Sequence, residues 1–166
     1  MRLEEAKKRF IDSWGALATQ WGINKTMAQI HALLMITPEA LSVEDIMEEL
    51  HISRGNVSMN LRELMNWGIV FKEFKSGERK DYFSSERDTV EMARKIAIER
   101  SRREIKPVLR VLGDVKKVDE SSNEAKFFSE KIDELEDLIG MADQTIEKVT
   151  SMSGNWFTKI VLKIIK

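Results

Sequence analysis

The hydrophobic pattern of residues 24–83 changes once, from a helical period to a strand-like one, and this change limits the possible folds. Apolar residues recur at spacings of three and four in three short segments, near residues 26–36, 42–50 and 53–66. Such spacings are typical of helices with one buried face. The runs IVFKEF at 69–74 and KDYF at 80–83 follow, with the turn residues KSGER between them. They predict a two-stranded hairpin after three helices.

Capping signals define where these helices begin and end. The predicted N-caps, with a reciprocal partner where there is one, are Thr26 with Gln29, Ser42 with Asp45, and Ser53. Pro38 ends the first helix, and Gly68 is a C-terminal signal after the third. Only the short segment HISR separates the second helix from the third. We therefore predict a mainly α fold with a small β-hairpin wing, a winged helix-turn-helix at residues 24–86.

Helical segments flank the predicted winged unit on both sides. Residues 1–23 predict an amphipathic helix whose apolar face holds Leu3, Ala6, Phe10, Trp14, Leu17 and Trp21. Residues 87–166 predict a helix that runs to about Val111 and is bent or interrupted at Pro107, a loop at 113–123, and a heptad-like seam at 128–149. We expect residues 1–23 and 87–166 to form a dimerisation region. The alternative is that the seam packs within its own chain.

One face of the second predicted helix of the helix-turn-helix is polar and suits DNA. Its candidate contact residues are Ser53, Arg54, Asn56, Ser58, Asn60 and Arg62. Arginine can pair with guanine and asparagine with adenine in the major groove, and serine can donate to phosphate. The wing adds the candidate phosphate contacts Lys75, Arg79 and Lys80. The alternative is that these side chains are simply a solvated face.

Charge is distributed unevenly along a chain whose net charge is only −1. Residues 51–80 are basic and contain both the polar helix and the wing, whereas residues 41–50 and 112–148 are acidic. Local fields of this kind decide where a polyanion docks. A second basic run, at 94–110, predicts either another DNA contact or an exposed helix face whose arginines pair with acids.

The run ISRGNVSMNLRELMNWGIVFKEFKSGERKDYF resembles the winged-helix regulators of the MarR superfamily, and more narrowly their GbsR-like branch. That branch typically shows a similar SxGNxSxxLRxLxxWGxV segment and a GxRKxYF-type wing. The upstream run FIDSWGALATQWGINKTMAQIHALLMI resembles it as well. The resemblance covers residues 8 to 106. It implies a homodimeric, DNA-binding transcriptional regulator, and we expect a repressor at a pseudo-palindromic operator.

Other classes of function find little support in the composition. The chain has no cysteine and two histidines, without ligand spacing for a metal. No nucleophile–base pair or phosphate-binding glycine loop is recognisable, so we expect no enzyme and no cofactor. The sequence has no stretch long enough to span a membrane and no signal-peptide pattern, so we expect a cytoplasmic protein.

Three alternatives remain open from the sequence. A small-molecule effector of unknown identity could bind in an aromatic cage that includes Trp14 or Trp21, although aromatic residues at helical spacing are more often core. Residues 155–166 form a basic amphipathic pattern that could dock on the protein or lie on a membrane. Finally, the winged helix could serve as a protein-interaction module without specific DNA binding.

Overall fold

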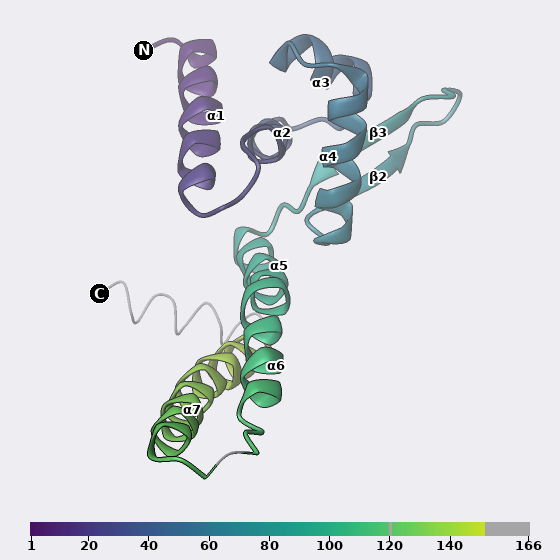
Figure 1. Cartoon of the computed structure of the whole chain (residues 1–166). Coiled ribbons are helices and arrows are strands. Elements are labelled where there is room, and N and C mark those ends of the chain that lie inside the picture. The colour runs from purple at the N-terminus through teal and green to yellow at the C-terminus, as the bar shows by residue number, and fades with distance from the viewer. Residues whose placement is uncertain (120, 152–166) are drawn as a thin grey trace. The chain divides into compact units, whose positions relative to one another are not determined.

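A computed structural model describes residues 1–119 and 121–151, in two compact units that meet between Met92 and Ala93. Figure 1 shows the order of the elements along the chain. The first unit contains α1 (Leu3–Gln20), α2 (Lys25–Ile36), β1 (Leu41–Ser42), α3 (Val43–Leu50), α4 (Arg54–Asn66), β2 (Val70–Phe74) and β3 (Asp81–Ser85). The amphipathic pattern predicted at 155–166 lies outside the described residues.

The core of the first unit lies among α2, α3, α4 and the sheet. Its fully buried side chains are Ile30, Leu34, Ile46, Val57, Leu61, Leu64, Ile69 and Val70. These residues come from the apolar positions of all three predicted helices and from the start of the predicted hairpin. The mainly α winged-helix fold expected from the sequence is therefore confirmed.

The sheet has three antiparallel strands in the order β1-β3-β2. The predicted hairpin forms β2 and β3, with Lys72 opposite Phe83 and Glu73 opposite Tyr82. The third strand, β1, was not predicted, because two residues are too few to show a strand period. It pairs with β3 through Leu41 opposite Phe83 and Ser42 opposite Tyr82. Strand β3, the middle strand of the sheet, is thus paired with a neighbouring strand on both edges.

The N-cap residues predicted from the sequence are found at α3 and α4 but not at α2. Ser42 and Asp45 form a complete capping box at α3, and the Ser53 hydroxyl accepts from the backbone N–H of Asn56 at α4. At α2 the predicted cap is wrong. Asn24, not Thr26, caps this helix, and its Oδ1 accepts from the Met27 N–H at 3.0 Å. Asparagine is as good an N-cap as threonine, so the signals two residues apart compete.

Helix α1 packs on α2 through a face other than the predicted apolar stripe. The buried residues of α1 are Ile11, Gly15 and Ala18. A Cβ added at Gly15 would lie 2.7 Å from Cγ of Gln29, so the glycine permits this close approach. The predicted stripe leaves Leu3, Leu17 and Trp21 exposed. Within the first unit, that stripe remains uncovered.

The second unit is built from one long interrupted helix and one continuous helix. Helix α5 (Thr89–Arg100), the π-helical turn η1 (Ser101–Ile105) and α6 (Lys106–Val115) follow one another directly, and α7 (Asn123–Ser151) packs on η1 and α6. The predicted interruption near Pro107 is a π-turn just before the proline, which has no N–H for the helical ladder. The predicted end near Val111 falls one turn too early. No helix in residues 1–119 or 121–151 has the length and hydropathy to cross a membrane.

Candidate nucleic-acid interface

Helix α4 presents an exposed polar face at its N-terminal end. Ser53, Arg54, Ser58 and Arg62 are exposed, and Asn56 is half-buried. Val57, Leu61 and Leu64 hold the opposite side of the helix in the core. Five of the six candidate residues of this helix therefore reach the surface. A helix exposed in this way can place side chains against base edges.

Asn60 does not lie on this exposed face, and the sequence prediction of its exposure is wrong. Its side chain is 4% exposed. It lies three residues after Val57 and four before Leu64, and this spacing places it on the buried stripe. Its Nδ2 donates to Oδ1 of Asn56 at 2.7 Å and to the Asn56 carbonyl at 2.8 Å. Asn60 is thus a support for Asn56 rather than part of the surface.

Arg54, the first residue of α4, pairs with an acid that the sequence analysis did not single out. Its Nη2 donates to Oε1 of Glu44, which lies in the first turn of α3. Both side chains are solvent-accessible, with exposed fractions of 61% for Arg54 and 43% for Glu44. The only sequence signal for Glu44 was its place in the acidic run 41–50, which does not predict a partner ten residues away.

The tip of the wing between β2 and β3 carries basic side chains, which differ in their surroundings. Arg79 and Lys80 are exposed. Lys75 is half-buried, with its Nζ 3.9 Å from the centre of the Tyr82 ring. The Tyr82 hydroxyl donates to Glu78, and this hydrogen bond raises the pKa of Tyr82 to about 12. Arg79 and Lys80 are therefore the more accessible candidates for phosphate contact.

The first turn of α3 lies close enough to the wing to interact with its charge. Hydrogen bonds from the Ser42 hydroxyl and backbone lower the pKa of Asp45, and the charges of Lys80 and Lys75 lower it further. A backbone hydrogen bond, followed by the Arg54 hydrogen bond, lowers the pKa of Glu44, and the charge of Lys80 contributes. The starts of α3 and α4 and the tip of the wing thus share one electrostatic environment.

The outer strand of the wing also exposes aromatic side chains. Phe74 is 79% exposed and Phe71 is also exposed. Nζ of Lys72 lies 5.3 Å from the centre of the Phe74 ring and 2.8 Å from Oδ2 of Asp81. Lys72 is therefore already engaged within the wing. In the sequence, these phenylalanines indicate only a strand.

The two tryptophans considered for an effector site lie apart from the polar face of α4. Trp14 is half-buried with its ring centre 5.6 Å from that of Phe10. Trp21 caps the C-terminal end of α1 and is 59% exposed. Binding of an effector by Trp14 or Trp21 stays a prediction.

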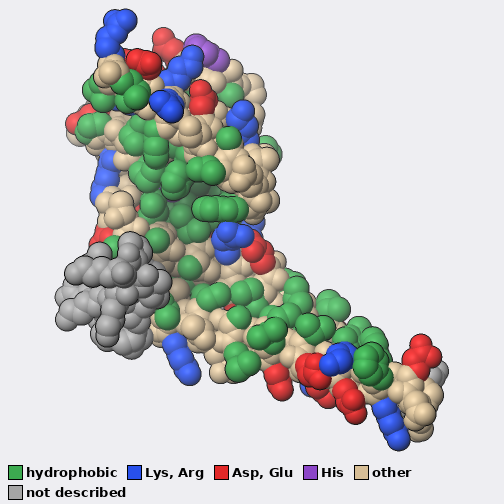
Figure 2. All heavy atoms as spheres, turned by 90° about the vertical axis from the view of Figure 1, so that its left-hand side faces the viewer, with side chains coloured by type: hydrophobic (Ala, Val, Ile, Leu, Met, Phe, Trp, Pro, Cys, Tyr) green, Lys and Arg blue, Asp and Glu red, His purple; other side chains and the backbone are tan. Residues whose placement is uncertain are grey.

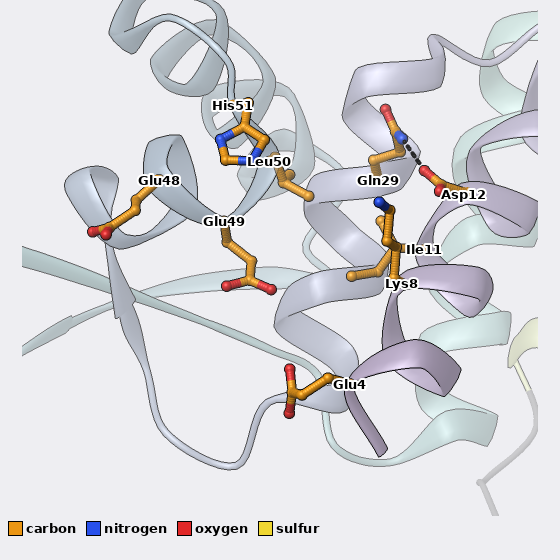
Figure 3. Close-up of a pocket in the computed structure, with 9 residues that line it drawn as sticks. All are labelled: Glu4, Lys8, Ile11, Asp12, Gln29, Glu48, Glu49, Leu50 and His51. Carbon is orange, nitrogen blue, oxygen red and sulfur yellow. Dashed lines mark hydrogen bonds between the residues drawn. The ribbon is translucent and has the colours of Figure 1, made fainter. Parts of the chain in front are cut away.

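A groove of about 450 Å³ does open between α1, α2 and the turn after α3 (Figure 3). It is lined by Glu4, Lys8, Ile11, Asp12, Gln29, Glu48, Glu49, Leu50 and His51. The Gln29 amide donates to Asp12 across one end of it at 3.2 Å. The surface is strongly acidic, which disfavours a nucleic acid here. The groove and the polar face of α4 are therefore chemically distinct.

The second basic run, residues 94–110, is largely paired with acids. Arg102 and Arg103 both contact the buried carboxylate of Glu99, and Arg100 pairs with Glu104. Hydrogen bonds from Arg102 lead the causes that lower the pKa of Glu99. Of the two sequence interpretations, ion pairing within the helix is the one that these contacts favour.

The described residues offer no metal site, since no group of three or more suitable ligands occurs in 1–119 or 121–151. His51 lies in the turn between α3 and α4 in a left-handed conformation, with φ of 53°. His31 is buried in α2, and its Nε2 has no hydrogen-bond partner among the described residues. Desolvation lowers the pKa of His31 to about 4, so it is neutral at pH 7.

Comparison with known proteins identifies the domain that carries this interface. Residues 21–80 match the model of the MarR family. Residues 21–80 are therefore similar to a MarR-family domain. This domain contains α2, α3, α4 and most of the wing, so all nine predicted DNA-contact residues lie within it. The family resemblance seen in the sequence is confirmed.

Two relatives of the MarR-family domain have names that concern transcription. The chain is 27% identical over 86 residues to the HTH-type transcriptional repressor GbsR of Bacillus subtilis (strain 168), covering 52% of this chain and 47% of the relative. It is 23% identical over 86 residues to the putative HTH-type transcriptional regulator YvaV of the same organism, covering 52% and 49%. The matched region is thus about half the length of either relative.

A solved structure extends the likeness in fold beyond the MarR-family domain. It is the crystal structure of a transcriptional regulator, with a TM-score of 0.64 and 19% identity. The alignment covers 88% of this chain and 96% of the other. At this identity the likeness shows a shared fold, which includes helices outside residues 21–80.

Proposed function

We propose that the chain is a homodimeric, sequence-specific DNA-binding transcriptional regulator that acts in the cytoplasm. We expect it to repress transcription. One observation carries the proposal. The N-terminal face of α4, with Arg54, Asn56, Ser58 and Arg62, is exposed in a MarR-family domain beside a basic wing. The expectation of a repressor is supported by the name of one relative, the HTH-type transcriptional repressor GbsR.

The division of labour among the residues follows from their chemistry. Arg54 and Asn56 have the donors and acceptors to read guanine and adenine in the major groove. Ser53, Ser58 and Arg62 suit phosphate or base edges, and Arg79 and Lys80 suit phosphates beside the groove. Lys75 adds charge from its place over Tyr82. Asn60 is withdrawn from the proposed contacts because it is buried.

Uncovered apolar surface supports the dimer. In the second unit, α7 exposes Phe127, Phe128, Leu135, Leu138 and Met141. An apolar groove of about 310 Å³ lies between α7 and the η1–α6 segment, and Figure 2 shows hydrophobic side chains gathered along this unit. Apolar surface of this extent is typical of an interaction site. Two copies would bring two α4 helices to sites roughly 34 Å apart, one turn of DNA.

The test begins with selection of duplexes from a random library by the full chain. Fluorescence anisotropy then compares the selected duplex, a scrambled duplex and the duplex upstream of the chain's own gene at several salt concentrations. We expect tight, salt-dependent binding to the selected sequence. Arg54→Ala and Asn56→Ala should lose the preference while circular dichroism remains unchanged. Unchanged affinity in both variants would contradict the assignment of α4 as the recognition helix.

One observation favours a second candidate, a protein-interaction module. Phe71 and Phe74 expose aromatic surface on the outer strand of the wing, which is an available sheet edge. Exposed apolar edges often bind other chains. A folded dimer without salt-dependent affinity for any duplex would support this candidate against DNA binding.

A further inference from the structure

The ion pair between Arg54 and Glu44 joins the first turns of the two helices of the helix-turn-helix. Arg54 is the first residue of α4, and Glu44 is the second residue of α3. Both side chains are largely accessible to solvent. The pair therefore lies on the surface that the proposed function assigns to DNA, where a base edge or a phosphate could compete for the same guanidinium.

The contact leaves much of the guanidinium available. Arginine carries five N–H donors in a fixed planar fork. Among the contacts of the described residues, Arg54 uses Nη2 toward Oε1 of Glu44. Its Nε and Nη1 remain for a second acceptor. A carboxylate on one nitrogen can thus orient the fork while the rest of it meets guanine, whose O6 and N7 accept two hydrogen bonds.

The negative charge of Glu44 and its neighbour Asp45 also favours discrimination between DNA sequences. The negative charge of Glu44 lies near both Arg54 and Lys80, and Asp45 lies near Lys80 and Lys75. These carboxylates reduce the attraction of the surface for phosphates in general. Sequence-independent binding is dominated by that attraction. Acids in this place therefore weaken binding to any duplex unless a specific contact compensates.

We propose that Glu44 is a specificity-determining positioning residue, which orients Arg54 toward a base edge and keeps it from sequence-independent phosphate contacts. This inference rests on the proposed function. It goes further by assigning discrimination between DNA sequences to an acid outside the recognition helix. Loss of Glu44 would free a flexible arginine to reach phosphates on any duplex. Affinity for scrambled DNA would then rise while the preference for the selected sequence would fall.

The experiment compares Glu44→Ala with the matched control Glu48→Ala. Glu48 is an exposed glutamate in the same helix, so its loss removes the same charge and the same side chain from α3 without removing the contact to Arg54. Affinities for the selected and the scrambled duplex are measured by anisotropy at one fixed salt concentration. Circular dichroism and thermal melting of both variants show whether each is folded.

We expect Glu44→Ala to bind the scrambled duplex about two- to fivefold more tightly than Glu48→Ala does, the range typical of an exposed ion pair. In Glu44→Ala, the ratio of the affinity for the selected duplex to the affinity for the scrambled duplex should fall by at least a similar factor relative to wild type. Glu48→Ala should change both affinities alike and leave the ratio unchanged. If Glu44→Ala and Glu48→Ala keep the same ratio, the inference is wrong, while the proposed function stands.

A double-mutant cycle shows whether Glu44 acts through Arg54. In an Arg54→Ala background, Glu44→Ala should have no more effect on the ratio than Glu48→Ala. A full effect of Glu44→Ala without Arg54 would overturn the positioning role. If Glu44→Ala melts at a lower temperature than Glu48→Ala, the milder variant Glu44→Gln replaces it in these measurements. If wild type binds no duplex, the proposed function fails first, and this inference fails with it.

Discussion

The Asn60 side-chain amide donates to both Oδ1 and the carbonyl oxygen of Asn56, one turn earlier in α4. A buried residue therefore fixes the orientation of a half-buried one that faces the proposed DNA surface. Asn56 needs both an acceptor and a donor to recognise adenine. Its Oδ1 is held by Asn60 and has a second lone pair, and its own Nδ2 is left to donate.

Substitution of Asn60 should reveal this support. In Asn60→Ala, two hydrogen bonds are lost at a buried position, and we expect unfolding to become easier by about 1–2 kcal/mol. Preference for the selected duplex should fall as well, because Asn56 is no longer oriented. Urea denaturation and anisotropy measure the two effects. Asn66→Ala, at the exposed C-terminal end of α4, is the control. Full preference in a folded Asn60→Ala would show that Asn56 needs no support.

Loss of a wing cation should change DNA binding in a different way from loss of Asn60. Lys80→Ala should weaken binding to the selected and the scrambled duplex alike and reduce the salt slope by about 1. The reason is that a phosphate contact carries no sequence information. Lys131→Ala, which removes the same charge from α7 in the second unit, should leave the slope unchanged. A loss confined to the selected duplex would instead indicate that Lys80 reads a base.

The buried histidine should make the fold sensitive to acid. The pKa of His31 is about 4 in the folded protein and about 6.5 in an unfolded chain, so the unfolded chain takes up a proton first. Its contribution to stability is complete above pH 6.5 and decreases as the pH falls toward 4. The total loss is about 3 kcal/mol, from roughly 1.4 kcal/mol per pKa unit.

Urea denaturation at several pH values measures this loss. His31→Leu should remove the part of the pH dependence that lies between pH 6.5 and 4. His51→Asn is the control, because asparagine tolerates the left-handed conformation of that exposed turn residue. An unchanged pH profile in His31→Leu would show that His31 does not titrate in this way.

The proposed dimer predicts the effect of a charge on α7. Leu138 is 60% exposed and lines the apolar groove of the second unit. Leu138→Lys would place a charge in an apolar interface and should convert dimers to monomers at micromolar concentration. Light scattering after size-exclusion chromatography measures the mass. Gln144→Lys, at an exposed polar position of the same helix, should remain dimeric. A monomeric wild-type chain would contradict the dimer itself.

The sequence predicted well those features that have a local pattern. The apolar periods located the helices, and the reciprocal pair of Ser42 and Asp45 located the start of α3. The predicted exposure of Asn60 was wrong because it followed the polarity of the side chain rather than its spacing from Val57 and Leu64. In α1, the predicted stripe was the more apolar one, yet the small residues around Gly15 face α2 because they permit close packing.

Features that depend on contacts distant in sequence could not be predicted. The pairing of β1 with β3 joins residues about forty positions apart, and two residues show no period. The contact between Arg54 and Glu44 depends on how α3 and α4 are arranged around the turn. The sequence predicts a bend or an interruption near Pro107, and the structure has a π-turn there, because the loss of one N–H can be accommodated in either way.

Ser42 belongs to two elements at once, as the last residue of β1 and the N-cap of α3. Its pairing with Tyr82 fixes the middle strand of the wing to the start of that helix. The segment from Phe74 to Asp81 extends beyond this fixed point, and it is tied back to it by Lys75 over the Tyr82 ring and by the hydrogen bond that Tyr82 donates to Glu78. Displacement of the root would require the cap of α3 to open. In the proposed function, the root of the wing and the start of α3 would therefore move together on a duplex.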